Sequence, residues 1–214
     1  MKYRIFIIIL FLVTFSLLNV SSDSHELTIY IDPGHGGIDP GTCVAETLEK
    51  DLNLQISLLL KEKLEKENIK VLLTRDGDYD LSSPSAMYRK KSDFDNRISL
   101  INKSSANMYI SIHMNYLEDK SYSGIQVFGT PNNLELASYL QNALNNKLNG
   151  RRESKEISNK LYMYRQLNKP GVLIECGFLS NEMERNKLKT HKYQTEISSA
   201  IYTAIINYYQ KIYN

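Results

Sequence analysis

The amino-acid sequence predicts an α/β protein: a single domain whose mostly parallel, twisted sheet carries helices on both faces and an active site at the carboxyl ends of the strands. The main observation is a strand, helix, strand unit, with an apolar run at 27–31, a helical pattern at 47–66 and a second apolar run at 69–74. Such units give parallel strands with a right-handed crossover, and ligands gather where those strands end. A length of 214 residues also suits one domain with a substantial core.

The first predicted strand, 27–31, ends in a loop that is rich in glycine. The segment DPGHGG follows it and carries one histidine, His35, with a glycine on each side. Proline and glycine rule out a regular continuation of the strand. Because glycines let the backbone fold tightly around whatever the imidazole holds, His35 is a candidate ligand.

The helix predicted at 47–66 has apolar residues at every fourth position, which indicates one buried stripe. Thr47 is a plausible N-cap, and Glu49 would then lie in the first turn. A plainer interpretation of Glu49 is that its charge complements the helix dipole. The stripe consists of Leu48, Leu52, Ile56, Leu60 and Leu64.

A second histidine lies near the end of the strand predicted at 108–115, MYISIHMN. Alternation along a strand places Ser111, His113 and Asn115 on one face. A single buried histidine is more often hydrogen-bonded in the core than a ligand. Two histidines at two strand ends, with a carboxylate available, instead indicate a metal site.

Glu175 lies within the apolar segment VLIECGF, part of a strand region predicted at 171–178. An unpaired carboxylate would be costly to bury there. We therefore expect a positively charged group to face Glu175.

The remaining segments alternate between polar loops and apolar patterns. Residues 76–93 are polar and irregular, and the short helix after them has Phe94, Ile98 and Ile101 on its buried face. The other predicted elements are strands at 124–129 and 161–167, helices at 134–148, 182–188 and 195–209, and a loop at 149–159.

Four motifs, in this order, resemble those of the zinc-dependent N-acetylmuramoyl-L-alanine amidases, which cut bacterial peptidoglycan. They are DPGHGG, the segment EKDLNL that begins at Glu49, SIHMN and IECGFLSN. The resemblance covers residues 27–209. Further segments, DYDL at Asp78, RKKSDF at Arg89 and INKSSAN at Ile101, resemble the sporulation members of that family.

The resemblance implies one Zn²⁺ per chain, held by His35, Glu49 and His113. It also implies that Glu175 acts as the catalytic acid and base. Glu46 is a rival ligand by residue type, but only Glu49 begins the matching segment, so we favour Glu49.

The implied reaction is hydrolysis of the amide between N-acetylmuramic acid and the L-alanine of the stem peptide. For the sporulation members, the implied substrate is spore-cortex peptidoglycan, which the cleavage prepares for muramic-δ-lactam formation. A zinc carboxypeptidase or endopeptidase acting on stem peptides is an alternative, since zinc, water and a glutamate would serve any amide. A second alternative is a non-catalytic wall-binding protein with a vestigial site.

Two residues are predicted to contact substrate, Arg97 and Asn115. Arg97 follows a basic run, Arg89, Lys90 and Lys91, and together these side chains could bind carboxylates of the stem peptide. The plainer interpretation of the basic run is a solvated surface.

Groups next to the ligands should orient the two histidines. By sequence and by strand face, Asp32 and Ser111 are the nearest candidates.

The two cysteines, Cys43 and Cys176, could pair in an exported protein or remain free. Because Cys176 follows Glu175 directly, it should point to the opposite face of the strand and pack in the core. We expect both cysteines to be structural, with a disulfide or a thiolate ligand as the less favoured interpretations.

The first residues, 1–22, are predicted to be a signal peptide or an N-terminal membrane anchor, and 27–211 the catalytic amidase domain. A basic start, MKYR, precedes an apolar run of the length of a signal-peptide core. We therefore expect export to the outer face of the cytoplasmic membrane or to the cell wall. For a sporulation enzyme this location would be the forespore intermembrane space.

The charge pattern limits the choice of partners. Lys2 and Arg4 are the only charged residues before Asp23, and the rest of the chain carries equal numbers of basic and acidic residues. This balance speaks against nucleic acid, whose binding needs clustered Lys and Arg. The expected partners are peptidoglycan, a membrane if the first segment is retained, and an activating protein of unspecified identity.

Overall fold

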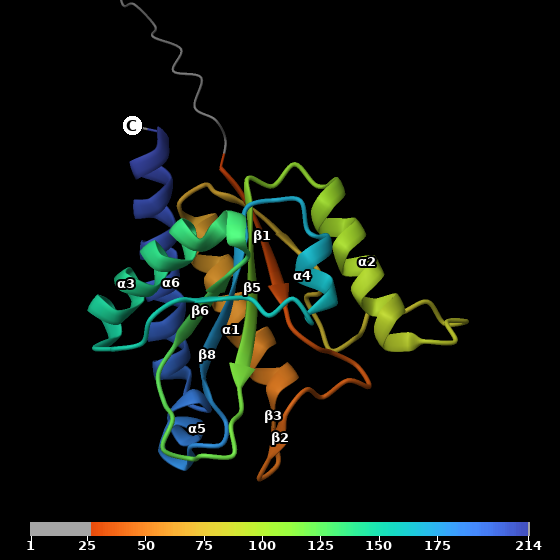
Figure 1. The fold of residues 1–214 in the computed structure, drawn as a ribbon, viewed down its shortest axis with the longest axis horizontal. Helices are drawn as coiled ribbons and strands as arrows, with labels where there is room; N and C mark the ends of the chain where they lie inside the picture. The colour runs from red at the N-terminus through yellow and green to blue at the C-terminus, as the bar shows by residue number, and fades with distance from the viewer. Residues whose placement is uncertain (1–26, 214) are drawn as a thin grey trace, which may run out of the picture.

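The computed structural model describes residues 27–213, and its centre is a six-stranded sheet (Figure 1). The strand order is β4-β1-β5-β8-β6-β7. β1 pairs in parallel with β4 and β5, β5 pairs in parallel with β8, and only β6 runs antiparallel to its neighbour β8. The predicted single, mostly parallel sheet is therefore confirmed. The strands are β1 (Thr28–Pro33), β4 (Lys70–Leu73), β5 (Met108–Asn115), β6 (Gln126–Gly129), β7 (Lys155–Glu156) and β8 (Gly171–Phe178).

Helices cover both faces of the sheet, as predicted (Figure 1). On one face α6 packs against both α1 and α3, while on the other face α2 packs against α4. A short helix, α5, follows the end of β8. The bounds are α1 (Glu49–Lys66), α2 (Arg89–Lys103), α3 (Leu134–Leu148), α4 (Tyr162–Gln166), α5 (Glu182–Leu188) and α6 (His191–Tyr213), and a 3-10 turn, η1 (Pro131–Asn133), precedes α3.

Alternation along the strands divides the core into two clusters. On β5, Ile110 and Ile112 face the large cluster under α1, α3 and α6, whereas Tyr109 faces a smaller cluster under α2 and α4. On β8, Ile174 and Leu173 divide in the same way. On the sheet face covered by α2 and α4, the strand side chains beyond the small cluster are polar, and they form the site described below.

The first helix begins two residues later than predicted, because a short hairpin precedes it. Thr47 is not an N-cap, because it lies in β3 (Thr47–Leu48), which pairs with β2 (Cys43–Val44). Helix α1 begins at Glu49, and Leu48 before it makes no side-chain cap. The hairpin keeps Thr47 in extended backbone, so the helical pattern can start only after it.

Three further predictions differ from the structure. Residues 161–167, predicted as a strand, contain the helix α4, because Met163 and Tyr164 bury themselves against the small cluster beside α2. The predicted loop at 149–159 contains β7, which extends the sheet by pairing with β6. Helix α6 begins at His191, four residues before the predicted start.

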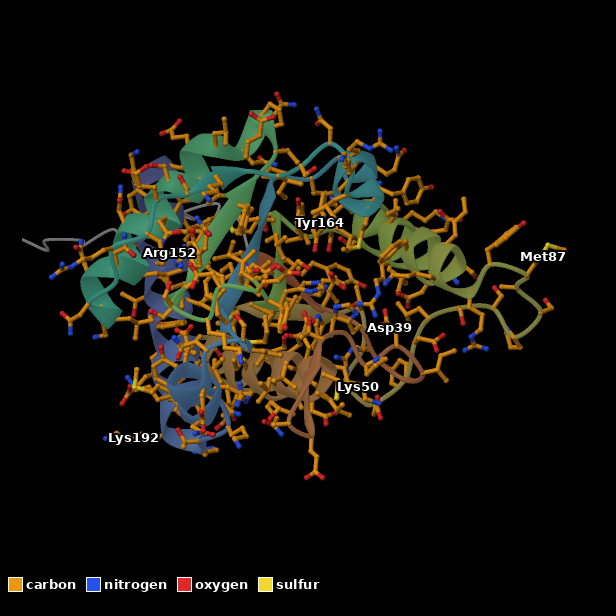
Figure 2. The ribbon with its side chains drawn as sticks, turned by 60° about the horizontal axis from the view of Figure 1, so that its bottom comes forward. Asp39, Lys50, Met87, Arg152, Tyr164 and Lys192 are labelled. Atoms are coloured by element: carbon orange, nitrogen blue, oxygen red, sulfur yellow. The ribbon has the colours of Figure 1, made fainter. Side chains whose placement is uncertain are left out.

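Cys176 is buried in the large cluster, as predicted, whereas Cys43 is exposed in β2, and both are free. The loop between β4 and α2 projects from the body, with Met87 at its tip (Figure 2). Between residues 27 and 213 no helix has the length and apolar character needed to cross a membrane. The predicted signal peptide or anchor, 1–22, lies outside the described residues.

Candidate metal centre

His35 is held in an unusual backbone conformation at the end of β1. Its φ is 62°, in the left-handed region that non-glycine residues rarely adopt. Gly36 and Asp39 exchange two backbone hydrogen bonds of 3.0 Å, which close the loop after it. The Nδ1 atom of His35 lies 2.9 Å from Asp39 Oδ2, so the Nε2 atom is left to face Glu49 Oε1 at 3.2 Å. The loop thus presents one ring nitrogen of His35 to the site.

Glu49 reaches the site from the first residue of α1 and is almost fully buried. Its Oε2 accepts a hydrogen bond of 2.8 Å from the Thr42 N–H, and its Oε1 lies 3.0 Å from His113 Nδ1. Burial alone would raise the pKa of Glu49, but hydrogen bonds with His113 and His35 outweigh it and lower the pKa. Glu49 is therefore a carboxylate between two imidazoles.

His113 lies near the end of β5, where the pairing with β8 shifts its register. The rings of His35 and His113 meet edge to face, with centroids 5.0 Å apart. A Cβ atom at Gly34 would lie only 2.2 Å from the His113 ring, so this position requires glycine. One donor atom from each of His35, Glu49 and His113 lies within 4.8 Å of the others. These three residues could hold a metal ion, whereas Glu46 is exposed in the hairpin and is not part of the cluster.

Glu175 pairs with His113 in the register of β5 and β8, so both point to the same face of the sheet. Its Oε2 atom is buried and has no hydrogen-bond partner among the described residues. Burial, and then the negative charge of Glu49, raise the pKa of Glu175 to about 8. An unpartnered carboxyl group that titrates near neutral pH suits proton transfer.

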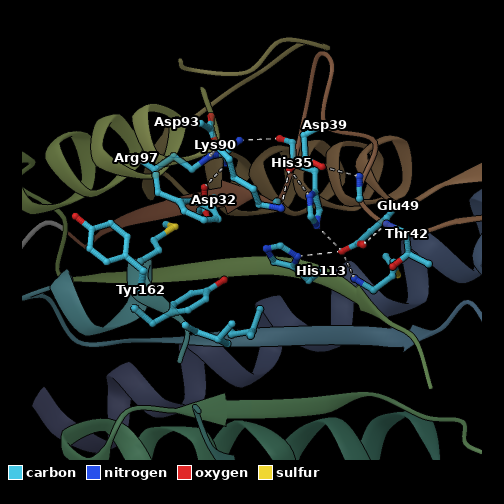
Figure 3. Close-up of a pocket in the computed structure, with 18 of the residues that line it drawn as sticks. Asp32, His35, Asp39, Thr42, Glu49, Lys90, Asp93, Arg97, His113 and Tyr162 are labelled. Atoms are coloured by element: carbon cyan, nitrogen blue, oxygen red, sulfur yellow. Dashed lines mark hydrogen bonds and ion pairs between the residues drawn. The ribbon is translucent and has the colours of Figure 1, made fainter. Parts of the chain in front are cut away.

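The cleft around these groups has a volume of about 540 Å³ and runs from the metal-binding cluster to α2 and α4 (Figure 3). Figure 3 shows Tyr162 of α4 at the opposite end from Glu49 and Thr42. The cleft brings together all the predicted ligands and the predicted catalytic group. The lining includes His35, Glu49, His113, Glu175, Lys90, Phe94, Lys160, Met163 and Leu173.

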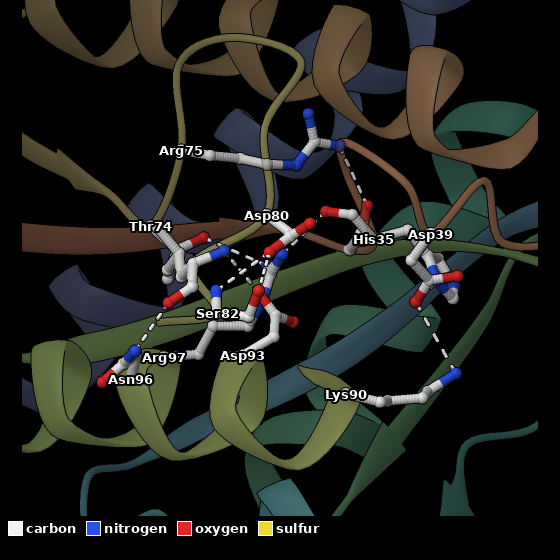
Figure 4. Close-up of polar contacts among 12 residues, drawn as sticks. His35, Asp39, Thr74, Arg75, Asp80, Ser82, Lys90, Asp93, Asn96 and Arg97 are labelled. Atoms are coloured by element: carbon white, nitrogen blue, oxygen red, sulfur yellow. Dashed lines mark hydrogen bonds and ion pairs between the residues drawn. The ribbon is translucent and has the colours of Figure 1, made fainter. Parts of the chain in front are cut away.

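Two buried arginines hold the backbone on which His35 stands (Figure 4). Arg97 of α2 donates to the carbonyl of His35 at 2.7 Å and to that of Pro33 at 2.9 Å. Arg75, which follows β4, donates to the carbonyl of Pro33 at 3.0 Å and to that of Gly34 at 2.9 Å. These bonds stabilise the left-handed conformation, which would otherwise cost about 1–3 kcal/mol.

Substrate contact by Arg97 stays a prediction, because its guanidinium is already bound by protein groups. The residue is 1% exposed, and its guanidinium forms ion pairs with Asp32 at 2.7 Å and Asp93 at 2.8 Å. Burial would lower the pKa of Arg97, but the two carboxylates raise it, so the group stays charged. Arg97 lines the cleft, but its guanidinium is engaged by protein acceptors and positions the loop of His35.

Asn115 stands apart from the cluster. It lies at the end of β5, beyond the register shift, and its side chain accepts a hydrogen bond of 2.8 Å from the Tyr116 N–H. Asn115 is half-buried and is not among the described residues that line the cleft. Substrate contact by Asn115 therefore stays a prediction.

The sequence did not reveal that Asp39 is the group that orients His35. Asp32 and Ser111 were expected to orient the histidines, but Asp32 instead accepts from Ser111 at 2.7 Å and pairs with Arg97. Asp39 makes the contact with His35, and this contact holds the Asp39 pKa below its usual range. The available signal was a carboxylate four residues after His35 in the same loop.

The protonation of His35 responds to the same neighbours. Burial alone would lower its pKa, but the hydrogen bonds with Asp39 and Glu49 raise it to about 9. Without metal, His35 is thus protonated at neutral pH and completes a charged network with the two carboxylates. Metal binding has to displace this proton from Nε2, so affinity falls at low pH.

Comparisons with known proteins agree on the family. The family model described as N-acetylmuramoyl-L-alanine amidase matches residues 29–207. A germination-specific N-acetylmuramoyl-L-alanine amidase of Bacillus subtilis (strain 168) is 37% identical over 219 residues, which cover 95% of this chain and 91% of that protein.

Solved structures give the same result. The CwlD amidase of Clostridioides difficile, in complex with the GerS lipoprotein, has a TM-score of 0.81 and 39% identity over 86% of this chain and 98% of that chain. An N-acetylmuramoyl-L-alanine amidase of Clostridium difficile 630 has a TM-score of 0.77 and 33% identity over 87% and 98%. Taken with the fold and the cluster of His35, Glu49 and His113, these matches show that the chain belongs to the N-acetylmuramoyl-L-alanine amidase family.

Proposed function

We propose that this protein is a peptidoglycan hydrolase: a zinc-dependent N-acetylmuramoyl-L-alanine amidase that cleaves the amide between N-acetylmuramic acid and L-alanine. The observation that carries the proposal is the convergence of His35, Glu49 and His113 in a cleft that also contains the unpartnered carboxyl group of Glu175. Family membership supports the same activity. We assign the catalytic domain to residues 27–211.

The donor set suits one zinc ion per chain. Two imidazole nitrogens and one carboxylate oxygen are a common ligand set of catalytic zinc, which keeps a further position open for water or substrate. Asp39 supports this assignment, because a histidine ligand usually gives its other ring N–H to a carboxylate. The Nδ1 hydrogen bond at 2.9 Å fixes which nitrogen of His35 faces the site.

A zinc ion held here would supply a Lewis acid for the scissile carbonyl and lower the pKa of a bound water to about 7. Glu175 would accept the proton of the attacking water at its free Oε2 atom. It would then donate that proton to the leaving nitrogen of L-alanine. Burial, which raises the pKa of Glu175, favours the protonated carboxyl group between the two steps.

The biological setting is inferred from the relatives. One relative is named as germination-specific, so we infer that the substrate here is spore-cortex peptidoglycan, cut in preparation for muramic-δ-lactam formation. This setting requires export, and we infer the forespore intermembrane space as the location. Because the CwlD amidase was solved with the GerS lipoprotein, we also infer an activating partner protein for this chain.

The test is mass spectrometry of purified peptidoglycan after digestion by the zinc-loaded protein. We expect stem peptides with a free L-alanine amino terminus. The Glu175→Gln variant should release none while it retains zinc, and Glu182→Gln, which changes an exposed glutamate on α5, should match the wild type.

The rival activities give other products. A carboxypeptidase or endopeptidase would leave L-alanine on the glycan, and a vestigial wall-binding protein would bind peptidoglycan and release nothing. Full activity in a zinc-loaded Glu175→Gln protein would remove Glu175 from the mechanism.

A further inference from the structure

The two ends of the cleft differ chemically, and this difference indicates how the substrate is oriented in it. Around the metal-binding cluster the lining carries three carboxyl groups, Asp39, Glu49 and Glu175, beside the imidazoles of His35 and His113. Toward α2 and α4 the lining is mostly apolar, and its Asp93 is paired with Arg97. Two lysines remain on this side: Lys160, and Lys90, which reaches back toward Asp39. Their ammonium groups would attract a ligand that carries carboxylates.

Only one member of the basic run lines the cleft. Arg89 pairs with Asp80 at 2.9 Å, and Lys91 pairs with Asp95 at 2.7 Å, so both are held by neighbouring carboxylates. Lys90 lies between them in the sequence, and it is the one that lines the cleft. The helix separates the three side chains by about 100° per residue.

Lys90 remains available for a ligand. Its Nζ lies 3.6 Å from Asp39 Oδ2, a loose ion pair, and 5.9 Å from the centroid of the Phe94 ring (Figure 3). The side chain is 65% exposed, and the Asp39 carboxylate already contacts His35 at 2.9 Å. The Lys90 ammonium group therefore retains donors that an incoming carboxylate could accept from.

Lys160 faces the same end of the cleft from the turn before α4. Among the described residues its ammonium group forms no ion pair. The acidic groups near this end are already engaged: Asp93 and Asp32 with Arg97, and Asp95 with Lys91. Lys160 is thus uncommitted here, and Lys90 is held only by its loose ion pair with Asp39.

We propose that the stem-peptide arm of the substrate lies at the α2 and α4 end of the cleft, where Lys90 and Lys160 bind its carboxylates. This inference rests on the proposed amidase function and assigns the specificity-determining residues of that site. The scissile amide lies at the metal-binding cluster, and the apolar lining of Phe94, Met163 and Leu173 packs against the peptide. The uncharged glycan arm leaves past the other end, near Thr42.

The test compares two muropeptide substrates that differ only in charge: one with free stem-peptide carboxylates and one with those carboxylates amidated. We expect Lys90→Met and Lys160→Met each to lower kcat/KM for the free-carboxylate substrate about three- to tenfold, mainly through KM. On the amidated substrate each variant should stay within about twofold of the wild type. Lys103→Met, an exposed change on the last turn of α2, is the matched control.

Failure of this inference can be distinguished from failure of the proposed function. Equal losses on both substrates, or no loss on either, would overturn the assignment of the lysines while leaving the amidase function intact. If the wild type cut neither substrate, the amidase function would fail.

Equilibrium titration with the free, L-alanine-headed stem peptide then tests the lysines independently of turnover. Weaker binding of that peptide by the Lys90→Met, Lys160→Met double variant, without a change for the amidated peptide, would support the assignment. Equal binding of both peptides by the wild type would contradict it.

Discussion

The two faces of the sheet use the same strands for different purposes. Toward α1, α3 and α6, strands β1, β5 and β8 present an uninterrupted apolar surface that includes Ile31, Ile112 and Ile174. Toward α2 and α4, the same strands present Asp32, Ser111, His113 and Glu175, beyond a much smaller apolar cluster. A parallel sheet with two covered faces usually buries apolar residues on both. The difference teaches that one face stabilises the fold, and that this stability supports the burial of charged groups on the other.

Neighbouring residues of one strand make the comparison testable, because they point to opposite faces. Ile174 and Glu175 are adjacent on β8, yet the first is fully buried in the large cluster and the second lines the cleft. Changes on one face should alter stability, and changes on the other should alter metal binding or catalysis.

The largest effect is expected for Glu175→Gln. It should lower kcat about 10²- to 10⁴-fold, since it removes the group that would move the proton. Zinc content should stay at one ion per chain, because Glu175 is not among the three clustered donors. Turnover and zinc stoichiometry measured on one preparation test this pair of outcomes, and loss of zinc together with activity would contradict it.

The adjacent change, Ile174→Ala, should act on stability instead. It removes buried methyl groups from the large cluster, which costs about 2–5 kcal/mol of unfolding free energy. Urea unfolding of wild type and variant gives this value. Zinc affinity and kcat of the folded fraction should stay within about threefold, and a larger loss of activity than of stability would show that the two faces are not separable.

The pH dependence of stability should show the cost of the polar face in the metal-free protein. The pKa of Glu175 is raised to about 8 from the usual 4.5, so between those values the folded state binds a proton that the unfolded state has lost. The contribution of Glu175 to stability therefore falls as pH rises through this window, by about 1.4 kcal/mol per pH unit at most, and levels off above it.

Glu175→Gln removes this proton exchange and is the natural comparison. Its unfolding free energy should exceed that of the wild type by an amount that grows from about pH 5 to pH 8. Denaturant unfolding at intervals of one pH unit measures the difference, and a difference that did not change with pH would mean that the burial of Glu175 has no such cost.

A smaller effect is expected for Asp39→Asn, which tests how the polar face is organised. The amide keeps the shape of the carboxylate but weakens its hydrogen bond with His35 Nδ1, so zinc affinity should fall about 10- to 100-fold. Competition with a chromophoric chelator measures the affinity. Asp119→Asn, an exposed change outside the cleft, is the control, and unchanged affinity in Asp39→Asn would remove the orienting role.

The smallest effect is expected for Cys43→Ser. Cys43 is exposed, free and outside both clusters, so the change should alter unfolding free energy by less than about 0.5 kcal/mol. Thermal unfolding with and without a reductant measures it. A reductant-dependent loss of stability in the wild type would indicate a disulfide and contradict the free thiol.

Several elements could be predicted from the sequence because their signals are local. Helices α3 and α5 have the predicted bounds, since their apolar spacing is visible within one segment. The position of Glu175 inside an apolar strand was likewise visible, as were the two histidines at strand ends. Strand alternation also determined that Cys176 would face the core while Glu175 faced the cleft.

Other features depend on which segments the tertiary structure brings together. Arg97 contacts the loop of His35, 62 residues earlier, so whether its guanidinium faces substrate or backbone could not be known before α2 was placed. The helix at Tyr162–Gln166 exists because α2 and the small cluster offer a surface for two of its side chains. The placement of α2 likewise decided that Lys90, and not Arg89 or Lys91, lines the cleft.

The sequence by itself therefore determined the places of β1, β4, β5, β6 and β8 along the chain, the two-sided alternation, and the residue types that could hold a metal. Only the tertiary structure decided that Asp39 orients His35, that Arg97 and Arg75 hold its backbone, and which charges remain free in the cleft. The physical reason is that backbone periodicity sets the direction of each side chain locally. The partner of a buried charge, in contrast, is selected by packing between distant segments.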